Sequence, residues 1–160
     1  MNTPNDYPPM SPYLTVKEAG EAIEFYKAAF GATELYRLSD PASGMIGHAE
    51  IKINGCHLML ADENLAWGNK SPLTLGGTPV KLCLMVEDTD AAVARASAAG
   101  ATVDMPPADM FYGFRSAAVR DPFGHQWMIQ HQIEKVEPEE MQKRWAEMLA
   151  SGATCESPEA

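Results

Sequence analysis

The sequence is poor in basic residues. Among 160 residues it has 12 Lys and Arg against 22 Asp and Glu, which gives a formal net charge of −10. A charge of this sign repels phosphate backbones and anionic lipid headgroups. We therefore expect neither a nucleic-acid partner nor a membrane partner.

Other features are also missing. The three cysteines, Cys56, Cys83 and Cys155, lack the close spacing of a zinc or redox motif. No apolar run approaches the length of a membrane span, and the first residues lack the basic start and apolar stretch of a leader. There is no phosphate-binding glycine loop and no nucleophile elbow. These absences predict a cytoplasmic protein without the chemistries that need such local motifs.

What the sequence does contain is an internal repeat. Val16 and Val86 each end an apolar run, and the helical patterns that follow end at Gly31 and Gly100, so both features recur after about 70 residues. The turns at Gly55 and Gly124 recur after 69 residues. A duplicated strand-helix-strand-strand-strand module explains these matching intervals.

The repeat predicts an α+β fold of two βαβββ modules. The first module covers residues 10–61, a linker rich in Asn, Gly and Pro covers 62–78, the second module covers 79–134, and a terminal helix covers 135–150. Residues 1–9 and 151–160 are predicted to be disordered tails. Residues 80–86 show no alternation, which predicts a strand buried on both faces. Residues 105–113 contain Pro106, Pro107 and Gly113 and are predicted to form a loop or an irregular edge.

Several motifs within this pattern resemble those of a known family. The helix end from Phe25 to Gly31 and the turn from Asp121 to His125 resemble the vicinal oxygen chelate superfamily, which includes glyoxalase I, bleomycin-resistance proteins and extradiol dioxygenases. The segments 11–14, 48–50, 121–127 and 137–141 are similar to its PhnB-like branch. The resemblance covers residues 9–145. It implies a curved mixed sheet around a cavity, a small organic ligand and a homodimer.

The resemblance also gives the positions of metal ligands. Metal-using members carry His or Glu at four places, which in this sequence hold Ser11, Met59, Lys81 and Met128. A hydroxyl, two thioethers and an ammonium group form a poor site for a divalent ion. We therefore expect no cofactor at the usual positions, and a divalent metal ion only if the site has moved.

His48 and Glu50 are the strongest candidates for chemistry. They are two residues apart on a predicted strand, so their side chains leave the same face of the sheet. His57, on the next strand, is expected to face the same way. An imidazole and a carboxylate suit general-base catalysis, with Lys81 stabilising a developing oxyanion. Alternatively, His48, Glu50 and His57 are three metal ligands, or His48 and Glu50 are a hydrogen-bonded pair on a solvated face.

Further residues are predicted to contact the ligand. Arg115 is a candidate to hold an anionic group, although a surface ion pair is the commoner role of such an arginine. The other candidates are polar or adaptable apolar side chains expected along the cavity or on the loop that closes over it: His57, Met59, Lys81, Gln126, Met128, Phe111 and Tyr112. Two functions stay open: a lyase, isomerase or dioxygenase-type enzyme using His48 and Glu50, or a protein that binds a small molecule without transforming it.

Overall fold

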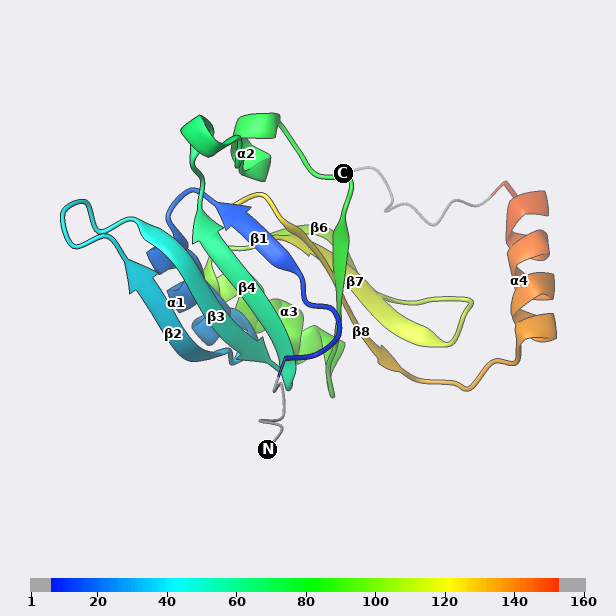
Figure 1. Cartoon of the computed structure of the whole chain (residues 1–160). Helices are drawn as coiled ribbons and strands as arrows, with labels where there is room; N and C mark the ends of the chain where they lie inside the picture. Colours follow the sequence, from blue (N-terminus) through cyan, green and yellow to red (C-terminus); the bar gives the residue numbers. More distant parts are fainter. Residues whose placement is uncertain (1–6, 153–160) are drawn as a thin grey trace. The chain divides into compact units, whose positions relative to one another are not determined.

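The computed structural model describes residues 7–152, and these fall into two compact units (Figure 1). The first unit contains the chain up to Pro79 together with the turn Pro122–His125. The second contains Val80–Asp121 and the chain from Gln126 onward. Most of the two predicted tails, residues 1–6 and 153–160, lies outside the described residues.

The first unit is a four-stranded mixed sheet with one long helix. Its elements are β1 (Tyr13–Val16), α1 (Ala19–Phe30), β2 (Thr33–Ser39), β3 (Ile46–Ile53) and β4 (Cys56–Asp62). The strand order is β1-β4-β3-β2, with β1 parallel to β4 and the other pairs antiparallel. The segment predicted as a linker contains a short 3-10 helix, η1 (Leu65–Trp67), and α2 (Pro72–Leu75).

The second unit repeats this arrangement and adds a terminal helix. Its elements are β5 (Lys81–Met85), α3 (Thr89–Ala99), β6 (Thr102–Asp109), β7 (Phe114–Arg120), β8 (Gln126–Gln132) and α4 (Pro138–Ala150). The strand order is β5-β8-β7-β6, with only β5 and β8 parallel. The α+β fold of two βαβββ modules followed by a C-terminal helix is therefore confirmed.

The strand register shows how closely the two modules correspond. Tyr13 lies opposite Met59 in the first sheet, and Cys83 lies opposite Met128 in the second. These pairs are 70 and 69 residues apart, the same intervals that relate the helix ends and the turns. The repeat seen in the sequence is thus preserved in the backbone pairing.

Alternating apolar residues attach each helix to its sheet. In β3, Ala49, Ile51 and Ile53 are buried, and α1 buries one apolar stripe that includes Ile23 and Tyr26. Since side chains alternate along a strand, the residues between them leave the opposite face of the sheet. The first unit therefore has an apolar face packed on α1 and a second face that bears His48 and Glu50.

Glycines end the two long sheet-packed helices as predicted. Gly31 and Gly100 both adopt the left-handed conformation, with φ angles of 66° and 116°. The N–H groups of Gly31 and Ala32 donate to the carbonyls of Lys27 and Tyr26, which closes the last turn of α1. Only glycine adopts this conformation without steric cost, so these residues stop the helices where the apolar stripe ends.

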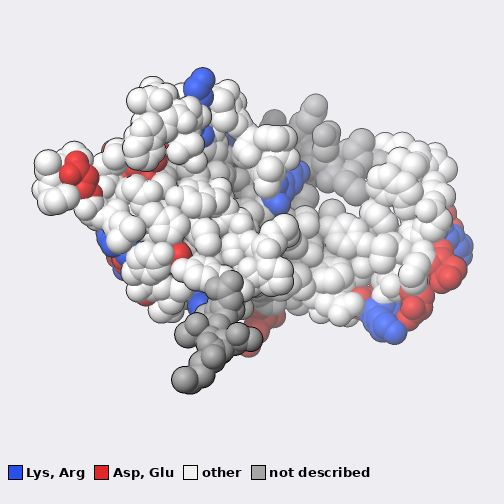
Figure 2. All heavy atoms as spheres, viewed as in Figure 1, with Lys and Arg blue, Asp and Glu red and all other residues white. Residues whose placement is uncertain are grey.

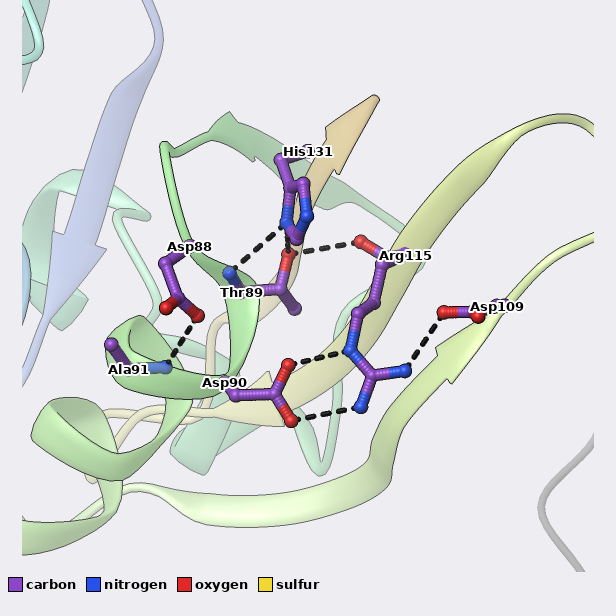
Figure 3. A network of polar contacts seen from close by, with 7 residues as sticks. All are labelled: Asp88, Thr89, Asp90, Ala91, Asp109, Arg115 and His131. Atoms are coloured by element: carbon purple, nitrogen blue, oxygen red, sulfur yellow. Dashed lines mark hydrogen bonds and ion pairs between the residues drawn. The ribbon is translucent and has the colours of Figure 1, made fainter. Parts of the chain in front are cut away.

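The beginnings of the same helices are capped from the last strand of each module. Asp62 in β4 accepts hydrogen bonds from the N–H groups of Glu18 (3.1 Å) and Ala19 (2.6 Å), and its second oxygen accepts from the N–H of Ile46 (2.7 Å). In the second module the equivalent residue is His131, whose Nδ1 accepts from the N–H of Thr89 at 3.1 Å (Figure 3). We had expected a surface position for His131; the cap makes it half-buried instead.

Two strands differ from the sequence-based expectation. Residues 80–86 were expected to be buried on both faces, but Val80, Cys83 and Met85 are exposed because β5 is an edge strand that pairs only with β8. Residues 105–109 were expected in a loop, but they belong to β6. This strand is also an edge, and its irregular register accommodates Pro106 and Pro107.

The helix α4 has no buried residue. Arg144 fastens it to the preceding segment, since its guanidinium contacts both oxygens of Glu134 at 2.8 Å and the carbonyl of Phe111 at 3.2 Å. Figure 2 shows charged side chains of both signs on the side of α4 that is at the right of the view. Another side of the helix, with Met141 and Trp145, forms an open apolar groove of about 320 Å³ with Phe111. No helix within residues 7–152 is long and apolar enough to cross a membrane.

The cap made by Asp62 predicts a large stability loss on substitution. D62A leaves three backbone N–H groups without their acceptor, so we expect the free energy of unfolding in urea to fall by about 3 kcal/mol. The matched control is D40A, because Asp40 accepts from the N–H groups of Ala42 and Ser43 in an exposed turn. D40A is expected to lose less than about 1 kcal/mol. Equal losses in the two variants would contradict the role assigned to Asp62.

Candidate functional site

The face of the first sheet opposite α1 carries a polar cluster centred on Glu50. Glu50 lies in the middle of β3, opposite Met59 of β4 on one side and Tyr36 of β2 on the other. His48 precedes it by two residues, and His57 lies opposite Lys52 on the same face. The structure thus brings together His48, Glu50 and His57, as their spacing predicted.

Glu50 is only 3% exposed and accepts four hydrogen bonds. Its Oε1 accepts from the hydroxyl of Tyr36 at 2.5 Å, from that of Tyr7 at 3.0 Å and from Nε2 of His48 at 3.1 Å. Its Oε2 accepts from Nε2 of His57 at 2.6 Å. A carboxylate with this many donors is held firmly and in its charged form.

The donors determine the protonation of Glu50. Burial by itself raises the pKa of this carboxyl, but the hydrogen bonds from Tyr36, the two histidines and Tyr7 outweigh it and lower the pKa from 4.5 to about 2. The same pairing with Glu50 raises the pKa of the Tyr36 hydroxyl. Glu50 is therefore a weak base, and its oxygens are already occupied. It is better suited to orient the histidines than to take a proton from a substrate.

The ionised carboxylate also fixes the tautomer of both imidazoles. Because Glu50 can only accept, the Nε2 atoms that face it carry protons. In each neutral ring the other nitrogen, Nδ1, is then an acceptor. Nδ1 of His48 lies 3.0 Å from the hydroxyl of Tyr13, and Nδ1 of His57 lies 3.1 Å from Oγ of Ser11. Two hydroxyl-imidazole arms therefore meet at one carboxylate.

The two arms differ in their access to solvent. The side chain of His48 is 23% exposed and lies beside the rings of Tyr13 and Tyr36, at centroid distances of 5.5 and 5.8 Å. His57 is only 7% exposed, and the ring of Tyr7 meets it edge-on at 5.2 Å. Tyr13 and Tyr36 are themselves largely exposed, so the His48 arm opens onto an aromatic surface.

Sequence reasoning did not assign Tyr7 or Tyr36 to the site. Tyr7 lies in the segment predicted as a disordered tail, and no periodicity marks its contact with Glu50. Tyr36 could have been found, since it belongs to the strand next to β3 and has the parity of the cluster's face. Ser11 entered only as a substituted metal position, without a role of its own.

The other predicted site residues lie at several places. Met59 is the cross-strand neighbour of Glu50 in the first unit. In the second unit, Lys81 pairs with Gln126 between β5 and β8, and Met128 follows on the same face of β8 as Gln126. Phe111 and Tyr112 form the turn between β6 and β7, where Phe111 packs on Trp145 at 5.5 Å. Their contact with a ligand stays a prediction.

Arg115 is occupied by two carboxylates (Figure 3). Its Nε and Nη2 donate to the two oxygens of Asp90 at 2.5 and 2.8 Å, and its Nη1 donates to Asp109 at 2.8 Å. These bonds raise the pKa of the guanidinium and lower that of Asp90. The surface ion pair, one of the two roles considered for Arg115, is therefore present. Binding of an anionic ligand by Arg115 stays a prediction.

The second unit has no counterpart of the polar cluster. By strand register, Ser116, Ala118 and Gln126 occupy the places that His48, Glu50 and His57 occupy in the first unit. Ser116 donates to Gln130 at 2.7 Å and accepts from Tyr112 at 3.2 Å, so this network is neutral. The ionisable cluster thus belongs to the first module alone.

The residues present do not fit the metal site that the resemblance implies. Its four positions hold a hydroxyl, two thioethers and an ammonium group, and in the described chain no group of three or more His, Cys, Asp or Glu side chains is arranged to hold a metal ion. Within the cluster, the histidine nitrogens nearest Glu50 are donors and have no lone pair for a metal. The alternative site of His48, Glu50 and His57 stays a prediction that would require this network to break.

The low pKa of Glu50 predicts a distinct acid sensitivity. Because its folded-state pKa is depressed from 4.5 to about 2, its stabilising contribution is complete above pH 4.5 and is lost as the pH falls toward 2. We expect E50Q to lack this part of the pH dependence and to unfold more easily at neutral pH, by about 3 kcal/mol. Urea unfolding over a pH series measures both effects.

Glu34 provides the matched control for this prediction. Hydrogen bonds from Arg37 and Lys27 also lower its pKa to about 2, but its side chain is 20% exposed and far from the histidines in the bonding network. E34Q should remove a smaller part of the acid dependence and leave the imidazole NMR signals unchanged. An acid slope in E50Q equal to that of the wild type would refute the role assigned to Glu50.

Comparison with known proteins agrees with this architecture. The profile of the Glyoxalase/Bleomycin resistance protein/Dioxygenase superfamily matches residues 10–129. The uncharacterized protein Mb0911c of Mycobacterium bovis is 44% identical over 141 residues, which cover 86% of this chain and 92% of the relative. The crystal structure of the Arabidopsis thaliana At5g48480 product superposes with a TM-score of 0.62 at 30% identity, covering 77% of this chain and 98% of that one.

A structure described as a PhnB protein from Bacillus cereus shares the fold with a TM-score of 0.60 at 17% identity, covering 78% of this chain and 99% of that one. The resemblance found in the motifs is therefore confirmed by an independent match along most of the chain. The chain belongs to the Glyoxalase/Bleomycin resistance protein/Dioxygenase superfamily.

Proposed function

We propose that this protein is an enzyme that moves a proton on a small organic molecule, in the manner of a lyase or isomerase, without the metal ligands usual in its superfamily. One observation carries the proposal: Glu50 fixes the tautomer of His48, so that the Nδ1 atom of a partly exposed imidazole accepts protons at the open end of the cluster. A neutral imidazole is a suitable general base near neutral pH.

The roles of the individual groups follow from their positions. His48 is the acid-base group, and Tyr13, whose hydroxyl contacts its Nδ1, passes the proton between imidazole and substrate. Burial raises the pKa of Tyr13, so its hydroxyl remains protonated and able to donate. Glu50 stabilises the imidazolium that forms when His48 takes a proton. The exposed rings of Tyr13 and Tyr36 offer apolar surface to the substrate.

A second candidate function is binding without chemistry. The four inherited ligand positions hold no imidazole or carboxylate, which removes the usual catalytic ion and favours a protein that only retains a small molecule. In that case the cluster would give hydrogen-bond polarity to a binding surface. The two functions differ in whether a bound molecule exchanges a proton.

We also propose that the protein is a cytoplasmic homodimer. The exposed apolar residues Val80 and Met85 on the edge strand β5 support association with a second chain. Cys56 and Cys83 are both free thiols, which suits a reducing compartment.

The proton-transfer function is tested by isotope exchange. Proton NMR in D2O would follow loss of the C–H signal next to the carbonyl in a panel of α-hydroxyketones and 2-oxo acids, with hydroxyacetone and pyruvate as first probes. We expect the wild type to accelerate exchange, and H48A to lower the rate at least about a hundredfold. H131Q is the matched control, since His131 lies in the second unit and caps α3.

Exchange at the same rate in H48A and the wild type would exclude His48 as the acid-base group. If the probes shift the His48 imidazole signals but none of them exchanges a proton in the wild type, the binding function is supported instead.

A further inference from the structure

The buried arm of the cluster has no part in the proton transfer proposed for His48. In this arm Oγ of Ser11 lies 3.1 Å from Nδ1 of His57, whose Nε2 lies 2.6 Å from Oε2 of Glu50. The three side chains come from separate places, since Ser11 precedes β1 while His57 and Glu50 lie in adjacent strands. A hydroxyl, an imidazole and a carboxylate are thereby joined in series.

The protons in this series have definite places. Glu50 accepts from Nε2 of His57, so Nδ1 carries the lone pair, and the Ser11 hydroxyl donates to it. A hydroxyl next to a base that a third group holds in position is the arrangement of an activated nucleophile. In the serine hydrolase triad Nε2 faces the hydroxyl. Here Nδ1 does so, and the order of donors and acceptors is the same.

The surroundings hold this arm in place. The N–H of Met59 donates to the carbonyl of Pro12 at 2.9 Å, which fixes the backbone next to Ser11 to β4. The ring of Tyr7 packs edge-on against His57, and His57 itself is buried. Ser11 is half-buried, so its hydroxyl is less enclosed than the imidazole that it contacts. The base is thus shielded from water, while the hydroxyl remains open to a small reagent.

We propose that Ser11 is a nucleophile and that the first unit hydrolyses small carboxylic esters. The Ser11 oxygen forms a bond to the carbonyl carbon as its proton passes to Nδ1 of His57. The bond from that carbon to the leaving oxygen then breaks, and the leaving group takes the proton from Nδ1. Water repeats the sequence on the acyl-serine: it gives its proton to His57, releases the carboxylic acid, and restores the Ser11 hydroxyl.

Covalent labelling tests this proposal. A small alkyl fluorophosphonate, which reacts with activated serine hydroxyls by releasing fluoride, would be added to the full chain, and intact-protein and peptide mass spectrometry would locate the adduct. We expect one adduct per chain on Ser11, none in S11A, and labelling at least about a hundredfold slower in H57Q. S97A is the matched control, because Ser97 is exposed on α3; its labelling should equal that of the wild type.

Turnover gives a second readout. Hydrolysis of p-nitrophenyl acetate should show an acetyl-enzyme on Ser11 and should fall at least about a hundredfold in S11A. An adduct on any other residue, or labelling in H57Q as fast as in the wild type, would overturn the proposal. S11A removes only a hydroxyl, so its proton NMR spectrum shows directly whether the fold is kept. H48A should abolish proton exchange and retain Ser11 labelling, which distinguishes this activity from the function proposed above.

Discussion

One buried negative charge organises the polar face of the first sheet. Taking a carboxylate out of water is unfavourable by several kcal/mol unless donors replace the water, and Glu50 has four of them. These donors come from the segment before β1 and from strands β2, β3 and β4, so the charge ties together most of the unit. The side chains cannot move independently, because loss of any one donor leaves part of the charge unsatisfied.

The duplicated modules divided their tasks unevenly. Both keep the same strand register and the same way of capping their first long helix, with Asp62 in one and His131 in the other. The chemistry did not stay equal. Where the first module has His48, Glu50 and His57, the second has Ser116, Ala118 and Gln126. Fold and catalytic potential are therefore separable within a single chain.

Local pattern was enough to predict most of the fold. The helical spacing before Gly31 and the alternation of β3 specify elements that the structure confirms. The pairing of His48 with Glu50 followed from their spacing of two on a strand. Edge strands were harder, since the apolar composition of residues 80–86 does not reveal that β5 has a neighbour on one side only. Tyr7 and Ser11 were missed because their contacts join residues more than 40 positions apart.

The turn between β7 and β8 shows how the two units depend on each other in the chain. Pro122–His125 clusters with the first unit, where the ring of Phe123 lies 6.1 Å from that of Phe25 and 6.4 Å from that of Tyr26. During synthesis on the ribosome, these aromatic residues of α1 leave the exit tunnel long before Phe123 does. The first half thus waits for the second to be translated before its core is complete, and a truncated chain ending at Pro79 would leave that aromatic cluster unfilled.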